Sequence, residues 1–196
     1  DIEYMDDFRV FTWDKNKFKN PKKMIEKLNK DGFKLVTIID PGVKVDRGYK
    51  IYDEGLSNDY FAKDKNGIVY TNEPASFNGP LPDDVLFNED GNIKEHKEVH
   101  NVYGHMMDKA TYEGLKQTGK RPFVVTRACY SGTQKYSTVW TGDNQSTWEH
   151  LRMSLPMLMN LGISGMAFCG TDVGGFGYDT TKELLSRWVQ LGAFTP

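Results

Sequence analysis

Residues 121–150 read RPFVVTRACYSGTQKYSTVWTGDNQSTWEH and contain two short apolar runs, each followed by polar residues. The runs are residues 122–126 (PFVVT) and residues 137–140 (STVW). Ser146 and Glu149 then form the S-x-x-E pattern of a capping box at a helix N-terminus. A strand, a loop and a capped helix in this order indicate an α/β fold with a parallel sheet.

The same pattern recurs on both sides of this stretch. Residues 33–39 (FKLVTII) form a nearly continuous apolar run, which is typical of a strand covered on both faces. Asn20 and Pro21 supply a helix cap and a first-turn proline, and Gly32 ends that helix. We therefore expect strands over 33–39, 122–126, 137–140 and 166–169, and helices over 21–32, 99–119, 146–162 and from a second capping box at Thr180 and Glu183.

The expected core sides of the helices follow from helical spacing. Trp188 lies at helical spacing from Leu184 and Leu191, so we expect it in the core. The helix that precedes residue 119 carries one apolar face, made of Val99, Val102, Tyr103, Met106, Ala110 and Leu115.

Residues 41–95 do not fit this pattern, because they show little helical or strand periodicity and many Asp, Asn, Gly and Pro residues. A structureless loop of that length is unusual inside a compact domain. The strand candidates named above are also too few for an eight-stranded barrel, which typically needs roughly 250 residues. The sequence therefore predicts either a functional insertion at 41–95 or the loss of a segment there.

Composition excludes several classes of protein. The chain of 196 residues has a net charge of -2 and no long basic block, which argues against binding to nucleic acid. Its longest apolar run, residues 155–161, is too short to cross a bilayer. Cys129 and Cys169 are too few for a disulfide framework, so we expect buried thiols in a reducing, cytoplasmic compartment, with one bridge between them left open as the alternative. Since the chain opens directly on DIEYMDDF, we expect the true N-terminus to be missing.

A charged residue follows the carboxyl end of each predicted strand. Asp40, Arg127, Asp143 and Asp172 each come just past a strand, the edge where both barrels and open sheets build their sites. Converging carboxylates suit metal binding, acid–base catalysis or hydrogen bonding to sugar hydroxyls. Each residue also has a structural interpretation, such as a cap or turn for the aspartates and a surface ion pair for Arg127. Trp140 and Phe176 stand beside these acids and suit the C–H faces of a sugar, although most aromatic residues serve the core.

Eight segments together resemble glycoside hydrolase family 31, the α-glucosidases and their relatives. In chain order they are DIEYMDDFRVFTWD, VTIIDPGVKV, YDEGL, NEPASF, HNVYG, RPFVVTRACYSG, VWTGDNQSTWEHLR and FCGTDVGGFG. The resemblance implies that residues 1–196 are part of one catalytic (β/α)₈ TIM barrel, with strands missing at the start and in the middle. It also implies a retaining glycoside hydrolase (EC 3.2.1.-) that needs no cofactor and no metal.

The resemblance also assigns roles to residues of this chain. The aspartate of the W-x-G-D motif, the family's acid/base, is Asp143. The residues that the resemblance places around the glucose are Asp1, Ile38, Asp40, Arg127, Trp140, Asp172 and Phe176.

The chain departs from the family pattern at the nucleophile. The family places this group at the first position of Asp-Met-Asn-Glu, whereas Tyr70 and Thr71 precede Asn72-Glu73-Pro74 here. GIVY is also joined directly to TNEP, without the long segment that normally separates them, which indicates a deletion at 70–71. The chain ends at Pro196, before the family's Arg-Asn-His element. Glu3 replaces an aspartate, a milder change.

The sequence therefore predicts an exo-acting α-glucosidase catalytic domain, represented incompletely and lacking the nucleophile. Its expected partner is an α-glucoside oligosaccharide, with no nucleic acid and no membrane, and a homo-oligomer is left open. One alternative is a sugar-binding or engineered scaffold fragment without catalysis. Another is a metal-dependent enzyme that uses Asp40, Asp143 and Asp172 as ligands.

Overall fold

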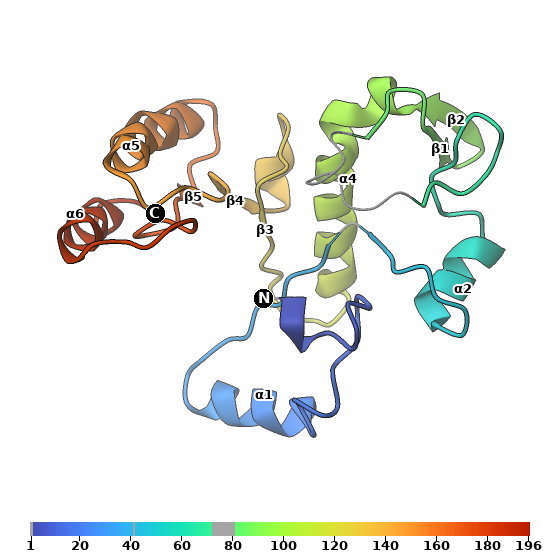
Figure 1. The fold of residues 1–196 in the computed structure, drawn as a ribbon, viewed down its shortest axis with the longest axis horizontal. Helices are drawn as coiled ribbons and strands as arrows, with labels where there is room; N and C mark the ends of the chain where they lie inside the picture. Colours follow the sequence, from blue (N-terminus) through green and yellow to red (C-terminus); the bar gives the residue numbers. More distant parts are fainter. Residues whose placement is uncertain (1, 41, 72–80) are drawn as a thin grey trace. The chain divides into compact units, whose positions relative to one another are not determined.

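The computed structural model describes residues 2–40, 42–71 and 81–196, and the chain divides into two compact units, Asp1–Glu98 and Val99–Pro196 (Figure 1). That residues 1–196 belong to one catalytic domain stays a prediction. In chain order the described elements are η1 (Ile2–Tyr4), α1 (Pro21–Lys30), α2 (Lys50–Ser57), β1 (Leu86–Glu89), β2 (Asn92–Glu95), α4 (His96–Lys116), β3 (Val125–Thr126), η2 (Thr133–Lys135), β4 (Thr138–Trp140), α5 (Trp148–Ile163), β5 (Cys169–Gly170) and α6 (Lys182–Gly192).

The first predicted helix is confirmed as α1. The side chain of Asn20 accepts a hydrogen bond from the backbone N–H of Lys23 at 3.0 Å, and Pro21 occupies the first helical position. Gly32 follows the helix with a φ of +87°, a conformation that L side chains rarely adopt. Cap, proline and glycine therefore set both ends of the helix, as the sequence indicates.

Residues 33–39 correct the sequence prediction, because they do not form a strand. Phe33, Val36 and Ile38 are exposed, and none of the described strands pairs with the segment. The carbonyl oxygen of Ile38 accepts a hydrogen bond from the Tyr4 hydroxyl at 2.7 Å, but that side-chain contact does not make a sheet. An apolar run needs a backbone neighbour to become a strand, and the described part of the first unit offers none.

Residues 41–95 contain more regular structure than the sequence suggests. They include α2 and a hairpin of β1 and β2, in which Leu86 pairs with Glu95 and Glu89 with Asn92. Asp90 and Gly91 form the turn with φ angles of +50° and +90°. Asp-Gly between two short strands is a strong hairpin signal, so the sequence did carry this element.

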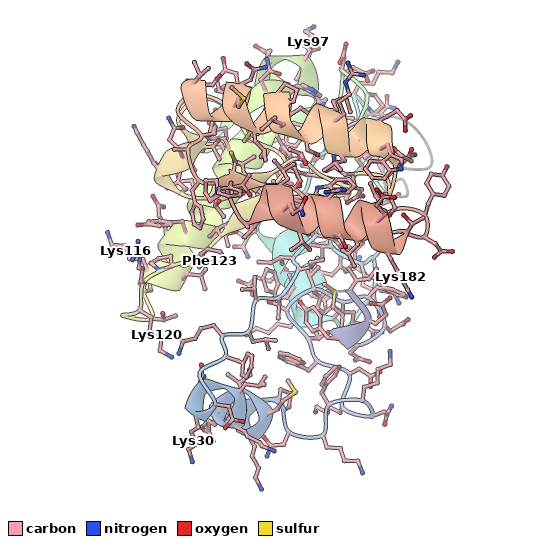
Figure 2. All side chains as sticks on the ribbon, turned by 90° about the vertical axis from the view of Figure 1, so that its left-hand side faces the viewer. Lys30, Lys97, Lys116, Lys120, Phe123 and Lys182 are labelled. Carbon is pink, nitrogen blue, oxygen red and sulfur yellow. The ribbon has the colours of Figure 1, made fainter. Side chains whose placement is uncertain are left out.

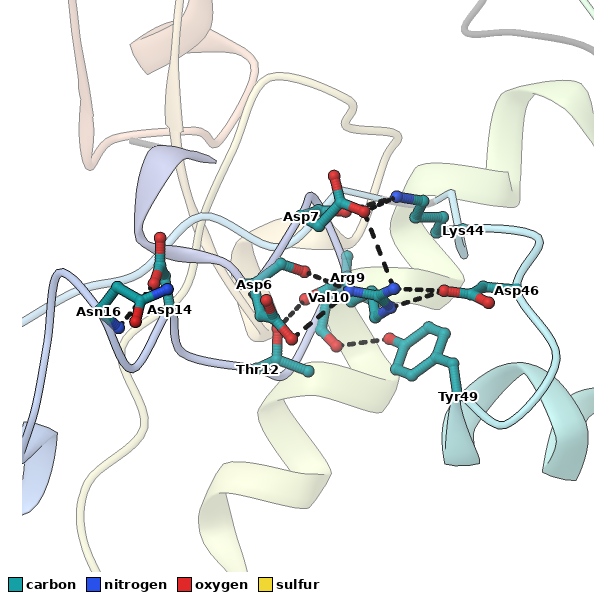
Figure 3. Close-up of polar contacts among 10 residues, drawn as sticks. All are labelled: Asp6, Asp7, Arg9, Val10, Thr12, Asp14, Asn16, Lys44, Asp46 and Tyr49. Atoms are coloured by element: carbon teal, nitrogen blue, oxygen red, sulfur yellow. Dashed lines mark hydrogen bonds and ion pairs between the residues drawn. The ribbon is translucent and has the colours of Figure 1, made fainter.

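A cluster of ion pairs ties residues 6–10 to residues 44–49 in the first unit (Figure 3). Arg9 donates from Nε to Asp46 at 2.9 Å, and Lys44 pairs with Asp7. The ammonium group of Lys44 lowers the pKa of Asp7 below its usual value. The hydroxyl of buried Tyr49 donates to the carbonyl oxygen of Val10, which is also buried. The cluster therefore joins two loops of this unit.

The second unit contains the predicted parallel sheet, in the order β3-β4-β5. Val125 pairs with Thr138, and Val139 pairs with Cys169. The strands are shorter than predicted, and β5 begins at Cys169, whereas the sequence predicted a strand over 166–169. β4, α5 and β5 form a strand–helix–strand unit, which confirms the α/β architecture.

The helices cover one face of this sheet. Val139 and Cys169 are buried on that face, and α5 and α6 lie side by side (Figure 2). Trp188 of α6 is 0% exposed, and its ring N–H donates to the Thr171 hydroxyl at 3.0 Å. The expectation that Trp188 belongs to the core is confirmed, and its hydrogen bond also anchors the loop after β5.

Both capping boxes are shifted by one residue from their predicted positions. The hydroxyl of Thr147, not Ser146, accepts from the backbone N–H of His150 and begins α5. Thr181, not Thr180, caps α6 in the same way. In each pair two adjacent residues are able to cap, and the sequence pattern does not separate them.

The packed side of α4 is also not the predicted one. Met106 is 45% exposed and Ala110 is exposed, whereas Asp108 is 2% exposed. Gly104 explains the orientation, because a Cβ at that position would lie 2.5 Å from the Cβ and the carbonyl oxygen of Ala128. Close backbone approach at Gly104 therefore turns a polar side of the helix inward and leaves Met106 outside.

Both cysteines are free thiols. Cys169 is buried as expected, but Cys129 is only half-buried, which corrects the prediction for that residue. Among the described helices, none combines the length and the apolar character that crossing a membrane requires.

Candidate active site

Three neighbouring parallel strands carry the candidate site of the second unit at their carboxyl ends. Arg127 directly follows β3, Asp143 comes three residues after β4, and Asp172 comes two residues after β5. Parallel strands present their carboxyl ends at one edge of the sheet, so these three side chains belong to the same edge. The structure therefore brings together three of the charged residues that the sequence singles out.

Arg127 and Asp143 are in direct contact. An Nη of Arg127 donates to a carboxylate oxygen of Asp143 at 3.1 Å, and both side chains remain more than half exposed. A tight turn helps to place the pair, because Gly142 has a φ of +82° and the side chain of Arg127 passes 3.6 Å from the position of a Cβ there. An arginine fork can orient a carboxylate and leave its other oxygen open to a ligand.

The loop after β4 is joined to the loop after β5 by backbone hydrogen bonds. The carbonyl oxygen of buried Asn144 accepts from the N–H of Phe176 at 2.6 Å, and Ser146 N–H donates to the Gly177 carbonyl at 2.7 Å. A Cβ at Gly175 would lie 2.6 Å from the backbone of Ser146. The glycine-rich segment after Asp172 is thus a turn, and it holds two site loops together.

Asp172 and Asp143 are electrostatically coupled. Burial raises the pKa of Asp172, and the negative charge of Asp143 raises the pKa further. A carboxyl group that keeps its proton to higher pH can donate a hydrogen bond as well as accept one. This behaviour suits a group that contacts sugar hydroxyls.

The two aromatic residues expected at the site lie in the same loops. Trp140 ends β4 and is half-buried, and Phe176 is exposed next to the Asn144 contact. Trp140 is positioned by β4, the strand that precedes Asp143, and Phe176 is positioned by the turn that follows Asp172. Whether they contact a ligand stays a prediction.

A buried acid behind the strands was missed by the sequence analysis. Asp108 of α4 hydrogen-bonds with the side chains of Thr126 and Ser137, and the Ser137 Oγ lies 3.4 Å from its carboxylate. Burial raises the pKa of Asp108 above the usual value. Thr126 immediately precedes Arg127, so Asp108 supports the end of β3 from the helix side. No sequence pattern marked it, because it lies opposite the apolar stripe of its helix.

The other expected site residues belong to the first unit. Asp1 lies outside the described residues, as do Asn72, Glu73 and Pro74. Ile38 and Asp40 are exposed in the segment that does not form a strand. Their assignment to the glucose site stays a prediction.

Metal binding by Asp40, Asp143 and Asp172 finds no support in the described residues, since they contain no group of three or more His, Cys, Asp or Glu side chains arranged to hold an ion. A hollow of about 770 Å³ in the second unit lies at the amino ends of the same strands, where Phe123, Tyr136 and Phe168 line it. It is therefore separate from the candidate site.

The chain matches the family profile described as "Glycosyl hydrolases family 31 TIM-barrel domain" in two pieces, residues 1–72 and residues 69–196. Together the pieces include every residue of the chain. They meet at 69–72, where the sequence indicates a deletion.

Curated relatives include two α-glucosidases. The chain is 48% identical to "Alpha-glucosidase 2" of Bacillus thermoamyloliquefaciens and 37% identical to "Neutral alpha-glucosidase AB" of Homo sapiens. Both alignments cover 100% of this chain, but only 31% and 26% of those relatives. The chain thus spans between a quarter and a third of their length.

Solved structures give the same result. A crystal structure of glucosidase II alpha subunit matches with a TM-score of 0.91 and 38% identity, covering 100% of this chain and 26% of that chain. The family 31 alpha-glucosidase from Bacteroides thetaiotaomicron matches with a TM-score of 0.79 and 36% identity, covering 100% of this chain and 39% of that chain. The fold prediction is confirmed: the chain is a partial TIM barrel.

The alignment with the Bacillus relative shows how many of its positions have no counterpart in this chain. The alignment with the Bacillus relative has 241 positions against 196 residues of the chain, a difference of 45. At least 45 positions of that relative therefore have no counterpart here. The split of the family match at 69–72 agrees with a single gap of this kind at the predicted deletion.

Proposed function

Because the chain belongs to the TIM-barrel domain of glycosyl hydrolase family 31, we propose that it forms part of the catalytic region of a retaining α-glucosidase. Its substrate is an oligosaccharide with a terminal α-linked glucose. The observation that carries the proposal is the contact of Arg127 with Asp143 at 3.1 Å, beside Asp172, at the carboxyl edge of three parallel strands. The names of the curated relatives support the same activity.

In this proposal Asp143 is the acid/base and the neighbouring groups hold the sugar. A retaining glycosidase uses one carboxyl group to protonate the leaving oxygen and then to activate water. Arg127 orients the Asp143 carboxylate, and Asp172 exchanges hydrogen bonds with glucose hydroxyls. Trp140 and Phe176 pack against the ring. The family resemblance also assigns glucose binding to Asp1, Ile38 and Asp40.

The chain alone carries out no retaining hydrolysis in this proposal. The second carboxyl group of the mechanism attacks the anomeric carbon to form a glycosyl ester, and Tyr70 and Thr71 stand where the family carries that group and its neighbour. The family match is also split at this place, at residues 69–72. Without that carboxylate no covalent intermediate forms, so the expected behaviour of the chain is sugar binding without turnover.

Calorimetric titration of the full chain with DNJ tests the site. One solved relative is titled as DNJ-bound, which makes this compound a suitable probe. We expect saturable binding that weakens at least about tenfold in Asp172→Asn. Asp179→Asn serves as the matched control, because Asp179 is exposed in the same loop. No saturable binding, or equal affinity of the two variants, would contradict the proposal.

A non-catalytic or engineered sugar-binding fragment is the second candidate, favoured by the absent nucleophile. The intact mass of the protein purified from its source separates the two. A mass above the 22.4 kDa of this sequence supports the catalytic region of a longer enzyme. A mass equal to it, with DNJ binding and no hydrolysis of maltose, supports the fragment.

Compartment and assembly remain proposals as well. The two free thiols suit a reducing compartment such as the cytoplasm. One similar solved structure is of ER glucosidase II, described as a heterodimeric complex of a catalytic subunit and the binding domain of a regulatory subunit. Non-reducing mass spectrometry after alkylation tests the thiols, and a bridge between Cys129 and Cys169 would contradict a reducing compartment.

A further inference from the structure

The loop that carries Asp143, residues 141–147, joins β4 to α5 and meets a different neighbour on each side. On one side Gln145 forms a parallel bridge with Gly177 of the turn after β5. In a parallel bridge the hydrogen bonds come from the residues that flank the bridged one, here Asn144 and Ser146. The N–H of Gln145 itself therefore points away from that turn and needs another acceptor.

The imidazole of His150 supplies this acceptor. The N–H of Gln145 donates to Nδ1 of His150 at 2.9 Å. His150 lies in the first turn of α5, where its own backbone N–H donates to the Thr147 hydroxyl at 3.3 Å. Its carbonyl oxygen accepts from the hydroxyl of fully buried Ser154 at 2.7 Å. The start of α5 therefore fixes the ring beneath the loop.

The contact determines the form of the His150 ring. A backbone N–H can only donate, so Nδ1 must offer its lone pair and the proton of the neutral ring must be on Nε2. A protonated imidazole carries hydrogens on both nitrogens, and two donors would then face each other. Histidine side chains usually change charge between about pH 5 and about pH 8. The hydrogen bond to Gln145 therefore exists only in the neutral form.

Other charged groups near His150 leave the ring to Gln145. The ionisable side chains on the elements around it are Glu149 and Arg152 of α5, Asp143, Asp172, Tyr178 and Asp179 of the site loops, and Lys182, Glu183 and Arg187 of α6. Among the described residues, none of these groups forms an ion pair or a side-chain hydrogen bond with His150. The loop backbone is therefore the partner that the ring holds.

We propose that neutral His150 is a positioning residue for the candidate site, which holds the Asp143 loop in place and releases it on protonation, so that sugar binding weakens. It acts through the backbone of Gln145, two residues after Asp143, and from the side opposite Gly177. The effect on sugar affinity rests on the function proposed above, whereas the contact itself does not.

Nitrogen NMR of the full chain tests the contact without a ligand. At about pH 8 we expect the ring proton of His150 on Nε2 and none on Nδ1. As the pH falls to about 5, the amide signals of Gln145, Asp143 and Phe176 should shift with the same midpoint as the His150 ring. A proton on Nδ1 at the higher pH, or loop amides that do not follow the ring, would overturn the proposal.

Two substitutions of His150 separate the acceptor from the charge. In His150→Asn the side-chain oxygen can take the place of Nδ1 and does not titrate, whereas His150→Phe keeps a ring without an acceptor. The probe is maltose, an uncharged sugar, measured by calorimetry at about pH 8 and about pH 5. We expect the parent and His150→Asn to bind equally at the higher pH, and the parent to bind about fivefold more weakly at the lower pH. His150→Phe should bind about fivefold more weakly than His150→Asn at both.

Comparison at the same pH removes the titration of Asp172 and the other acids, because all three proteins share them. Circular dichroism checks that each variant keeps the fold. The same ratio of parent to His150→Asn affinity at both pH values would overturn the proposal. If none of the three proteins binds maltose, the proposed function fails, and the NMR titration alone decides whether His150 holds the loop.

Discussion

Residues 33–39 and residues 122–126 have similar apolar sequences but different structures. PFVVT supplies β3 of a parallel sheet, whereas FKLVTII stays exposed and unpaired among the described residues. β3 has β4 as a neighbour, and Gly104 of α4 packs against Ala128 just after β3, whereas residues 33–39 have no such neighbours among the described residues. The difference teaches that an apolar run becomes a strand only where a backbone partner and a covering helix are present.

This difference decides which site residues the structure assembles. Arg127, Asp143 and Asp172 lie at one sheet edge because β3, β4 and β5 pair with one another. Ile38 lies in the unpaired run and Asp40 follows it, so none of the described sheets fixes their position. The central claim is therefore that pairing between neighbouring strands, more than the apolar content of a segment, brings the site residues together.

The largest expected effect comes from separating α4 from the end of β3. Gly104→Val would put a Cβ 2.5 Å from the Ala128 carbonyl oxygen, and overpacking of this kind should lower the free energy of unfolding by about 3 kcal/mol. Gly114→Ala in the same helix has no neighbour within 4 Å and should be neutral or stabilising. Urea unfolding of both variants gives the comparison, and equal stabilities would show that the helix contact does not support β3.

A matched pair of valine truncations compares the two regions directly. Val139→Ala removes a side chain of β4 that is 4% exposed, and we expect it to cost about 2 kcal/mol of unfolding free energy. Val36→Ala removes an exposed side chain of the unpaired run, and its cost should be below about 0.5 kcal/mol. Thermal and urea unfolding measure both values. A similar cost at the two positions would mean that residues 33–39 are packed after all.

Helix capping should have a smaller and purely local effect. Thr181→Ala removes the hydroxyl that accepts from Leu184 N–H and should cost about 1 kcal/mol. Thr180→Ala should cost less than half of that, because Thr180 is not the cap. The reverse order of stabilities in urea would restore the capping box that the sequence suggested.

The smallest expected effect is a pH dependence that originates at Asp108. Its pKa is raised in the folded chain by burial, so the folded state binds this proton more tightly than the unfolded state does. The resulting stability is present below the unfolded pKa and is lost as pH rises through the folded value. Asp108→Asn should therefore gain stability relative to the parent as pH rises from about 4 to 7. Ser137→Ala removes a hydrogen-bond donor to Asp108, so its stability should depend more steeply on pH than that of the parent. Parallel curves of unfolding free energy against pH for the parent and both variants would contradict this origin.

The sequence predicted the elements whose determinants are local. Asn20, Pro21 and Gly32 set the ends of α1, and PFVVT and STVW gave two parallel strands with charged residues behind them. Those charged residues assembled as expected because the order of parallel strands fixes where their carboxyl ends meet.

The remaining features depend on partners that a local pattern does not contain. Residues 33–39 have strand-like composition, but their pairing depends on a neighbour elsewhere in the fold. The packed side of α4 is set by Gly104 and by the hydrogen bonds of Asp108, against the apolar stripe. Tertiary contacts overrode the helical periodicity there.

Amide hydrogen exchange at single-residue resolution tests the central claim most directly. The N–H of Val139 donates to the Phe168 carbonyl at 3.2 Å inside the sheet, whereas none of the described strands pairs with Val36. In the full chain we predict that the Val139 amide is protected at least about a hundredfold more than the Val36 amide. Equal protection of the two amides would contradict the account, because it would show that residues 33–39 form a strand without the neighbours that β3 to β5 provide for one another.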